Sequence, residues 1–242
     1  MTDFGYREVS PEEKTRLVGR VFSSVATRYD LMNDDLMSLG VHRLWKRHFV
    51  ASCGIRSGQR QLDLAGGTGD IACLSRGRGA EVCVADINYD MLTVGRSRMD
   101  AIGLVQGLEW LQVNAETLPF SDNQFDHVTI AFGLRNVTFR DRALAEMYRV
   151  LKPGGRVHVL EFSTVRLPGL SRLYDSWSFK VLPRLGAQVA GDAESYQYLA
   201  ESIRRFPDQE TLAGHMREAG FERVKWSNLS GGICAIHHGA KV

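Results

Sequence analysis

The sequence predicts an α/β fold in which a mostly parallel sheet carries helices on both faces and ends in an antiparallel hairpin. Two patterns support this prediction. After residue 60, short apolar runs alternate with amphipathic helical segments, an order typical of parallel sheets. Near the C-terminus, Ser230-Gly231-Gly232 joins two strand-like runs, which indicates a hairpin. The seven expected strands lie at 61–65, 81–86, 108–113, 127–132, 156–161, 222–229 and 233–238.

Capping residues and glycines indicate where the helices begin and end. Ser10, with Pro11 after it and Glu13 three residues on, signals the start of a first helix. Asn88, Thr138 and Asp208 are expected N-caps. The run Lys152-Pro153-Gly154-Gly155 stops a helix and turns the chain into the next strand. Further helices are expected at 69–76, 88–102, 138–151, 167–186, 192–205 and 208–220.

Length and composition favour a single globular domain. A chain of 242 residues with 44% apolar and 24% charged residues can bury one sizeable core. We divide it into an N-terminal helical cover (1–55), a cofactor-binding core (56–165), a helical lid (166–206), and a C-terminal helix with the hairpin (207–242).

The same survey narrows the functional classes. Residues 1–11 resemble neither a signal peptide nor a transit peptide, so we expect a cytoplasmic protein. No apolar run approaches the roughly 20 residues that span a bilayer, so any membrane contact would be peripheral. A net charge of +2 without a long basic run gives no reason to expect nucleic acid. No metal is expected, because the four cysteines lack metal-type spacing and are interpreted as reduced, buried thiols: Cys53, Cys73, Cys83 and Cys234.

The first predicted strand runs directly into a glycine cluster, Asp63-Leu64-Ala65-Gly66-Gly67-Thr68-Gly69-Asp70. A strand, a tight turn and a helix N-terminus in this order let a ligand approach the backbone. Many glycine loops only turn the chain, so this motif needs support from elsewhere. In an open α/β sheet, that support is expected at the C-terminal ends of the other parallel strands.

Polar residues do follow those strand ends. Asp86 lies about 20 residues beyond the glycine loop, the spacing at which a carboxylate binds a nucleoside ribose. Asn114 follows the third strand. Each has a structural alternative, a turn or capping role. Asp70, directly after the loop, would repel a pyrophosphate, which favours a cationic or zwitterionic adenosyl ligand over a dinucleotide.

The full series of motifs resembles that of class I S-adenosylmethionine methyltransferases, which have a Rossmann-like fold. More narrowly, it is similar to the ubiquinone/menaquinone biosynthesis C-methyltransferase family. The segment Phe132-Gly133-Leu134-Arg135-Asn136-Val137 is more specific than the glycine loop, and the resemblance extends over nearly the whole chain. The other matching motifs are Ala85-Asp86-Ile87-Asn88, Asn114-Ala115-Glu116, Leu118-Pro119-Phe120, Leu151-Lys152-Pro153-Gly154-Gly155, Tyr29-Asp30-Leu31-Met32-Asn33-Asp34 and His42-Arg43-Leu44-Trp45-Lys46.

The resemblance implies S-adenosyl-L-methionine as the cofactor. Carried over to this chain, it implies that Thr68 and the loop glycines hold the methionine part. Asp86 would bind the ribose hydroxyls, and Asn114 with Ala115 would lie by the adenine. The implied cofactor-binding residues are Gly66, Gly67, Thr68, Gly69, Asp86, Ile87, Asn114 and Ala115. One departure is Ala131, where a serine is common in the family, so a hydroxyl contact is lost there.

The implied reaction is methylation of a ring carbon of a reduced polyprenyl quinone, a demethylmenaquinol or a 2-polyprenyl-6-methoxy-1,4-benzoquinol. A quinol hydroxyl titrates around 10, as a phenol does, so the ring needs a base or a cationic stabiliser near neutral pH. We assign this catalytic role to Arg135, which would stabilise the ring oxyanion, and Asn136, which would orient a water. The alternative for Arg135 is a structural salt bridge to Asp141 or Glu161.

Other assignments stay open at this point. Tyr174, Asp175 and Tyr196 are candidates for the substrate pocket, with packing of a helical lid as the alternative. The aromatic segment 167–186 would accept an isoprenoid tail or rest on a membrane surface. A homodimer or a quinone-biosynthesis assembly is a further expected partner. The rival functions are a class I methyltransferase for small hydroxyl or amine acceptors and a non-catalytic, cofactor-binding subunit.

Overall fold

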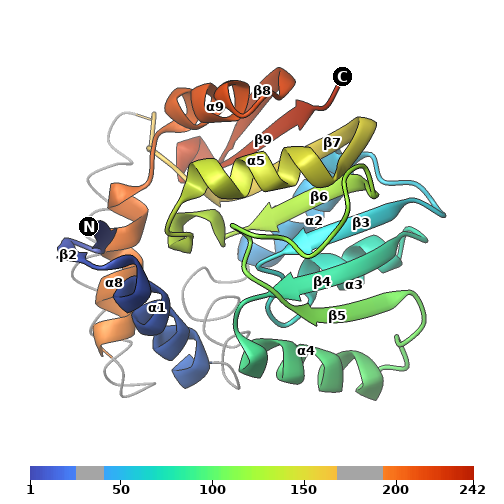
Figure 1. Cartoon of the computed structure of the whole chain (residues 1–242), viewed down its shortest axis with the longest axis horizontal. Helices are drawn as coiled ribbons and strands as arrows, with labels where there is room; N and C mark the ends of the chain where they lie inside the picture. Colours follow the sequence, from blue (N-terminus) through green and yellow to red (C-terminus); the bar gives the residue numbers. More distant parts are fainter. Residues whose placement is uncertain (26–40, 168–192) are drawn as a thin grey trace.

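The computed structural model describes residues 1–25, 41–167 and 193–242 and confirms the predicted α/β fold (Figure 1). A seven-stranded sheet has the order β5-β4-β3-β6-β7-β9-β8. The neighbouring pairs among the first five strands are parallel, and β9 pairs antiparallel with both β7 and β8. The strands are β3 (Arg60–Leu64), β4 (Glu81–Asp86), β5 (Leu108–Gln112), β6 (Phe125–Ala131), β7 (Leu151–Phe162), β8 (Glu222–Leu229) and β9 (Cys234–Ala240).

The strand order reverses between β3 and β6, which places a ligand site there. Leu64, the last residue of β3, pairs with Ala85 of β4 on one side and with Ile130 of β6 on the other. The C-terminal ends of these three strands therefore lie level with one another. β7 begins earlier than predicted, because Leu151 pairs with Phe125 before a bulge that takes up 152–155.

Two groups of helices cover the two faces of the sheet. On one face, α2 (Val41–Cys53), α3 (Asp70–Arg76) and α4 (Tyr89–Ala101) contribute to an apolar cluster around Phe49 and Ile71. On the other face, α5 (Arg140–Val150) and α9 (Gln209–Glu218) contribute to a cluster around Leu144 and Leu212. The crossovers through α3, α4 and α5 thus bury an apolar helix face against the sheet, whereas β5 and β6 are joined by a loop. No helix in the described ranges combines the length and the hydropathy that a membrane span requires.

Most of the predicted helix starts are confirmed. The side chains of Ser10, Asn88 and Asp208 accept backbone N–H groups three residues on, at the starts of α1 (Pro11–Val25), α4 and α9. The predicted N-cap at Thr138 is wrong, since α5 begins at Arg140. The backbone N–H groups of Thr138 and Phe139, which precede the helix, donate to Glu116 Oε1 at 3.0 and 3.1 Å, so a carboxylate from another loop holds the turn into α5.

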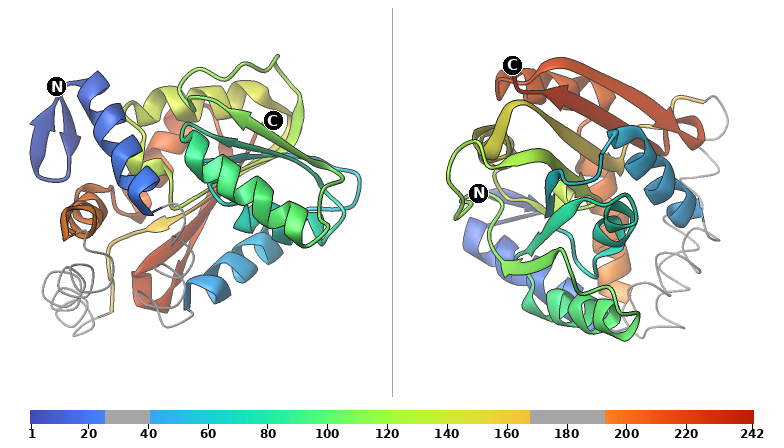
Figure 2. Two further views of the ribbon diagram at one scale, coloured as in Figure 1. Left: turned by 90° about the horizontal axis from the view of Figure 1, so that it is seen from below. Right: turned by 90° about the vertical axis from the view of Figure 1, so that its right-hand side faces the viewer.

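An N-terminal hairpin was not predicted from the sequence. Strands β1 (Thr2–Phe4) and β2 (Arg7–Val9) pair antiparallel, and Phe4 stacks on Tyr198 of α8 (Ala193–Arg205) with ring centroids 4.1 Å apart. The buried Lys14 donates to Asp3 Oδ1 (3.3 Å) and to the carbonyl oxygen of Val137 (3.4 Å). The hairpin, α1 and α8 therefore form one layer at the carboxyl edge of the sheet (Figures 1 and 2).

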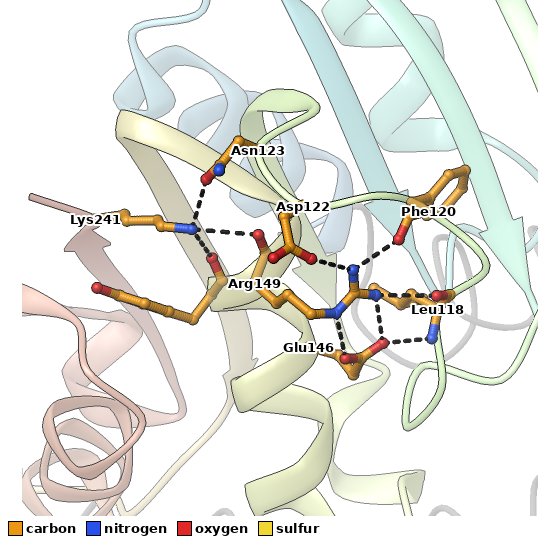
Figure 3. A network of polar contacts seen from close by, with 8 residues as sticks. Leu118, Phe120, Asp122, Asn123, Glu146, Arg149 and Lys241 are labelled. Carbon is orange, nitrogen blue, oxygen red and sulfur yellow. Dashed lines mark hydrogen bonds and ion pairs between the residues drawn. The ribbon is translucent and has the colours of Figure 1, made fainter.

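Figure 3 shows how the loop between β5 and β6 is fastened to α5. The Arg149 guanidinium donates to Glu146 at 2.7 Å and to Asp122 at 2.9 Å. It also donates to the carbonyl oxygens of Phe120 and Leu118, at 2.7 and 3.0 Å. Leu118, Phe120 and Asp122 precede the start of β6 at Phe125, so the bonds hold this later part of the loop against the C-terminal end of α5.

The cysteines are unpaired with one another, as predicted. Cys53, Cys83 and Cys234 are buried, whereas Cys73 is only half-buried. The predicted helix at 167–186 and the motif at 29–34 lie outside the described residues, as do Tyr174 and Asp175.

Gly95 is predicted to be required for packing, although it lies within α4. A Cβ atom there would lie 2.7 Å from Trp110 Cζ3 and 2.9 Å from the carbonyl carbon of Thr68 in the glycine loop. Gly95→Ala should therefore lower the free energy of unfolding by about 1–3 kcal/mol, measured by urea denaturation. The matched control is Gly214→Ala in α9, where no atom lies within 4 Å of the added Cβ. In this control the free energy of unfolding should rise by up to about 1 kcal/mol, because alanine has a higher helix propensity than glycine. A stabilised Gly95→Ala protein would contradict the account.

Candidate functional site

One cavity lies at the C-terminal ends of the parallel strands, where the strand order reverses. Its floor is the glycine loop, and its walls are the ends of β4 and β6, the loop after β5, and α1. The predicted residues that line it are Gly66, Gly67, Thr68, Asp86, Ile87, Asn114, Ala115 and Asn136. Gly69 and Arg135 are not among its lining residues.

The glycine loop is shaped by close backbone approaches. A Cβ atom on Gly66 would lie 2.6 Å from Val84 Cγ1. Gly69 has a φ of 83°, and a Cβ atom there would lie 2.8 Å from the Trp110 ring. Gly69 is therefore needed for the turn into α3 and for packing, while Gly66 and Gly67 present their backbone to the cavity.

Asp86 ties the glycine loop to the end of β4. Its Oδ2 accepts the backbone N–H of Gly67 at 3.0 Å, and its Oδ1 accepts that of Asn88 at 2.8 Å. Burial raises the pKa of this carboxyl, and the bonds from the backbone N–H groups of Asn88 and Gly67 oppose that rise. The turn role is thus observed, and it leaves lone pairs on each carboxylate oxygen for further donors.

Asp70 is neutralised by two cations. Its carboxylate accepts Lys46 Nζ at 2.6 Å and is also paired with the Arg98 guanidinium. Burial raises the pKa of Asp70, but these two cations outweigh it and the pKa is lowered. The sequence argument that Asp70 repels a phosphate is therefore weakened, since its charge is countered by Lys46 and Arg98.

Asp63 is a cavity residue that the sequence reasoning left out of the site. It is fully buried in β3, and its Oδ1 accepts the Thr129 hydroxyl at 2.7 Å. Burial raises its pKa to about 7, the Thr129 bond opposes that rise, and the charge of Asp86 adds to it. The available signal was a charged residue inside an apolar strand, three positions before the first glycine of the loop, because burying a carboxylate is costly and carboxyl groups with shifted pKa values cluster at functional sites.

Arg135 and Asn136 lie in a short 3-10 turn, η3 (Leu134–Asn136), after β6. Arg135 is buried, and its guanidinium donates to Glu161 Oε1 at 2.9 Å and to the carbonyl oxygen of Phe132. The alternative of a salt bridge to Glu161 is thus observed, and a catalytic role for Arg135 stays a prediction. Asn136 lines the cavity, and its Oδ1 accepts the hydroxyl of Tyr198 at 2.9 Å.

Of the remaining candidate residues, some line the cavity and others do not. Asn114 and Ala115 line it, and Asn114 Oδ1 accepts the backbone N–H of Glu116 at 2.9 Å in a turn. Tyr196 is buried in α8 and does not line the cavity. Tyr198, two residues on, was missed by the sequence reasoning. Within the described ranges, no group of three His, Cys, Asp or Glu side chains is arranged to hold a metal ion.

The pair formed by Arg135 and Glu161 predicts a large stability effect. Both side chains are almost fully buried, at 5% and 1% exposure. Arg135→Met would leave the Glu161 carboxylate buried without its guanidinium, at a cost of about 3–5 kcal/mol in the free energy of unfolding. Arg135→Met combined with Glu161→Gln should recover much of that loss in guanidinium denaturation.

The control is Arg166→Met, which breaks an exposed pair with Asp208 (3.0 Å) and should cost less than about 1 kcal/mol. If Arg135→Met were as mild as Arg166→Met, the structural role of the buried pair would be refuted.

Comparison with known proteins adds the family. The ubiE/COQ5 methyltransferase family matches residues 8–241. A curated relative from Xanthomonas axonopodis pv. citri (strain 306), named ubiquinone/menaquinone biosynthesis C-methyltransferase UbiE, is 59% identical over 244 residues. That alignment covers 100% of this chain and 96% of the relative. A second with the same name, from Yersinia pestis (strain Pestoides F), is 59% identical over 243 residues, 99% of this chain and 96% of the relative.

A similar solved structure shares the fold alone. The [4+2]-cyclase SpnF superposes with a TM-score of 0.69 at 20% identity, covering 93% of this chain and 94% of that one. The family and the fold imply the use of S-adenosylmethionine. Because the family match spans nearly the whole sequence, this chain belongs to the ubiE/COQ5 methyltransferase family.

Proposed function

We propose that the protein transfers a methyl group from S-adenosylmethionine to a ring carbon of a reduced polyprenyl quinone, in ubiquinone or menaquinone biosynthesis. The observation that carries this proposal is 59% identity, over the full chain, to curated C-methyltransferases of that pathway. The cavity supports it, because carboxylates and glycine backbone meet there at the ends of adjacent parallel strands.

The residues around the cavity fit a cationic adenosyl cofactor. Asp86 would accept the ribose hydroxyls with the lone pairs that Gly67 and Asn88 leave open. Thr68 and the glycine loop would hold the methionine part, with the Asp63 carboxylate favouring its positive charge. Asn114, Ala115 and Ile87 would lie by the adenine. When bound, the cofactor supplies an electrophilic methyl group.

The chain's own task is to position the acceptor ring and keep water out. Apolar side chains of α1 (Val18 and Phe22) and Phe132 line the cavity beside the polar groups. Opposite charges on the nucleophile and the electrophile cancel as the bond forms, so a dry, well-oriented site favours the reaction. Asn136 offers an amide to the ring oxygen, while Arg135, held by Glu161, fixes the turn that carries it.

Methyl transfer to quinols is the direct test. Purified protein with labelled S-adenosylmethionine and chemically reduced demethylated quinones should yield a carbon-methylated product, identified by mass spectrometry. Asn136→Ala should reduce turnover by roughly 100-fold, within the range for loss of one donor to a developing oxyanion, while still binding the cofactor. Methylation of only hydroxyl or amine acceptors would overturn the proposal, and so would cofactor binding without any transfer.

A second test uses the titration of Asp63. A cationic cofactor binds best when Asp63 is ionised, and the pKa of that group is about 7 in the free protein. Affinity for S-adenosylmethionine should therefore rise with pH, by about tenfold between pH 6 and pH 8, measured by calorimetry. Asp63→Asn should bind more weakly at pH 8 and lose this rise.

S-adenosylmethionine has titratable groups of its own, which affect both proteins equally. Dividing the affinity of the wild type by that of Asp63→Asn at each pH therefore leaves only the contribution of Asp63. Asp126→Asn is the control, because the pKa of Asp126 is already lowered by its bonds to the Arg60 backbone and to Lys152, which outweigh its partial burial. The same pH dependence in wild type and Asp63→Asn would refute the assignment of Asp63.

A further inference from the structure

The hydrogen bond between Tyr198 and Asn136 joins the helical cover to the turn that follows β6. Tyr198 Oη donates to Asn136 Oδ1 at 2.9 Å, and Tyr198 is only 5% exposed. The two residues are 62 positions apart in the sequence. Tyr198 comes from α8, outside the parallel core, whereas Asn136 lies at a strand end and lines the cavity.

This bond determines which end of the Asn136 amide faces a ligand. An asparagine side chain has one accepting oxygen and one donating NH₂ group. Because Tyr198 occupies Oδ1, Nδ2 is the end that is directed to an acceptor. A donor at this place suits an oxygen that gains negative charge during the reaction.

Tyr198 is itself held in place from two sides. Its ring stacks on Phe4 of the N-terminal hairpin, with centroids 4.1 Å apart and the planes inclined by 13°. One turn further along α8, Glu201 Oε2 accepts the backbone N–H of Tyr6 in the same hairpin, at 2.9 Å. Burial raises the pKa of Tyr198, so the phenol keeps its proton and remains a donor at neutral pH.

We propose that Tyr198 is a positioning residue: its hydroxyl orients the Asn136 amide so that Nδ2 donates to the ring oxygen next to the carbon that is methylated. This inference rests on the proposed function and assigns a role to the N-terminal hairpin and α8, which hold the tyrosine. The acceptor that it selects has an ionisable ring oxygen beside a nucleophilic ring carbon, the chemistry of a hydroquinone.

A double-mutant cycle tests the coupling. Tyr198→Phe keeps the ring that stacks on Phe4 and removes only the hydroxyl. It should lower kcat about three- to tenfold, which corresponds to the free energy of one hydrogen bond, and it should leave the KM for S-adenosylmethionine unchanged. Added to Asn136→Ala, it should cost nothing further, because the group that it orients is gone. The control is Tyr148→Phe. Tyr148 contacts Phe221 in the apolar cluster that α5 and α9 form on the sheet, so this variant should leave kcat unchanged.

Two kinetic results would overturn the inference. One is wild-type turnover by Tyr198→Phe. The other is a full, independent effect of Tyr198→Phe in the Asn136→Ala background, because a purely structural loss would act equally in both backgrounds.

A readout that does not depend on turnover separates this inference from the proposed function. In a ¹⁵N–¹H spectrum, the side-chain NH₂ signals of Asn136 are identified by their loss in Asn136→Asp. They should shift in Tyr198→Phe and stay in place in Tyr148→Phe. If the wild-type protein methylates no quinol, the proposed function fails while this spectrum still tests the positioning. Unshifted Asn136 signals in Tyr198→Phe would refute the positioning itself.

Discussion

The carboxylate of Asp86 is the interaction on which the site depends. It accepts the backbone N–H groups of Gly67 and Asn88, so one side chain fixes both the glycine loop and the turn into α4. Asn88 then extends the connection: its Oδ1 caps α4, and its Nδ2 donates to the carbonyl oxygen of Gly19 and to Ser23 Oγ in α1. A half-buried acid at a strand end therefore helps to hold the floor of the cavity and one of its walls in place through bonds within the protein.

In the proposed reaction, the sheet supplies the cofactor site, and the turn after β6 with its helical cover supplies the groups that position the acceptor ring. The same fold occurs in a [4+2]-cyclase, so the parallel core alone does not determine a reaction. Arg135 illustrates this division. Its guanidinium pairs with Glu161 within the buried turn and does not line the cavity, so a structural role is observed while its catalytic role stays a prediction. The polar end of Asn136 is in turn fixed by Tyr198, a residue of the cover.

The sequence alone was sufficient to predict the features that depend on neighbouring residues in the chain. Alternating apolar runs predicted the strands, and the caps at Ser10, Asn88 and Asp208 followed from side chains that act within one turn. Contacts between distant residues could not be predicted. Thr138 is not the cap because α5 begins only at Arg140, and the turn before it is held by Glu116, a residue 22 positions from Thr138 that accepts its backbone N–H. The partners of Asp70 and Asn136 likewise come from elements that only folding brings together. For Arg135 the sequence left Asp141 and Glu161 as alternative partners, and only the fold selects Glu161.

The central claim is that the strand-end cavity binds S-adenosylmethionine through Asp86. Calorimetric titration of S-adenosylmethionine into the wild-type protein and into Asp86→Ala tests it most directly. The account predicts one site per chain in the wild type. In Asp86→Ala it predicts an affinity at least about tenfold lower, the loss of a charged hydrogen-bond acceptor worth about 1.5–3 kcal/mol. Equal affinities for the two proteins, or no binding by a folded wild-type protein, would contradict it.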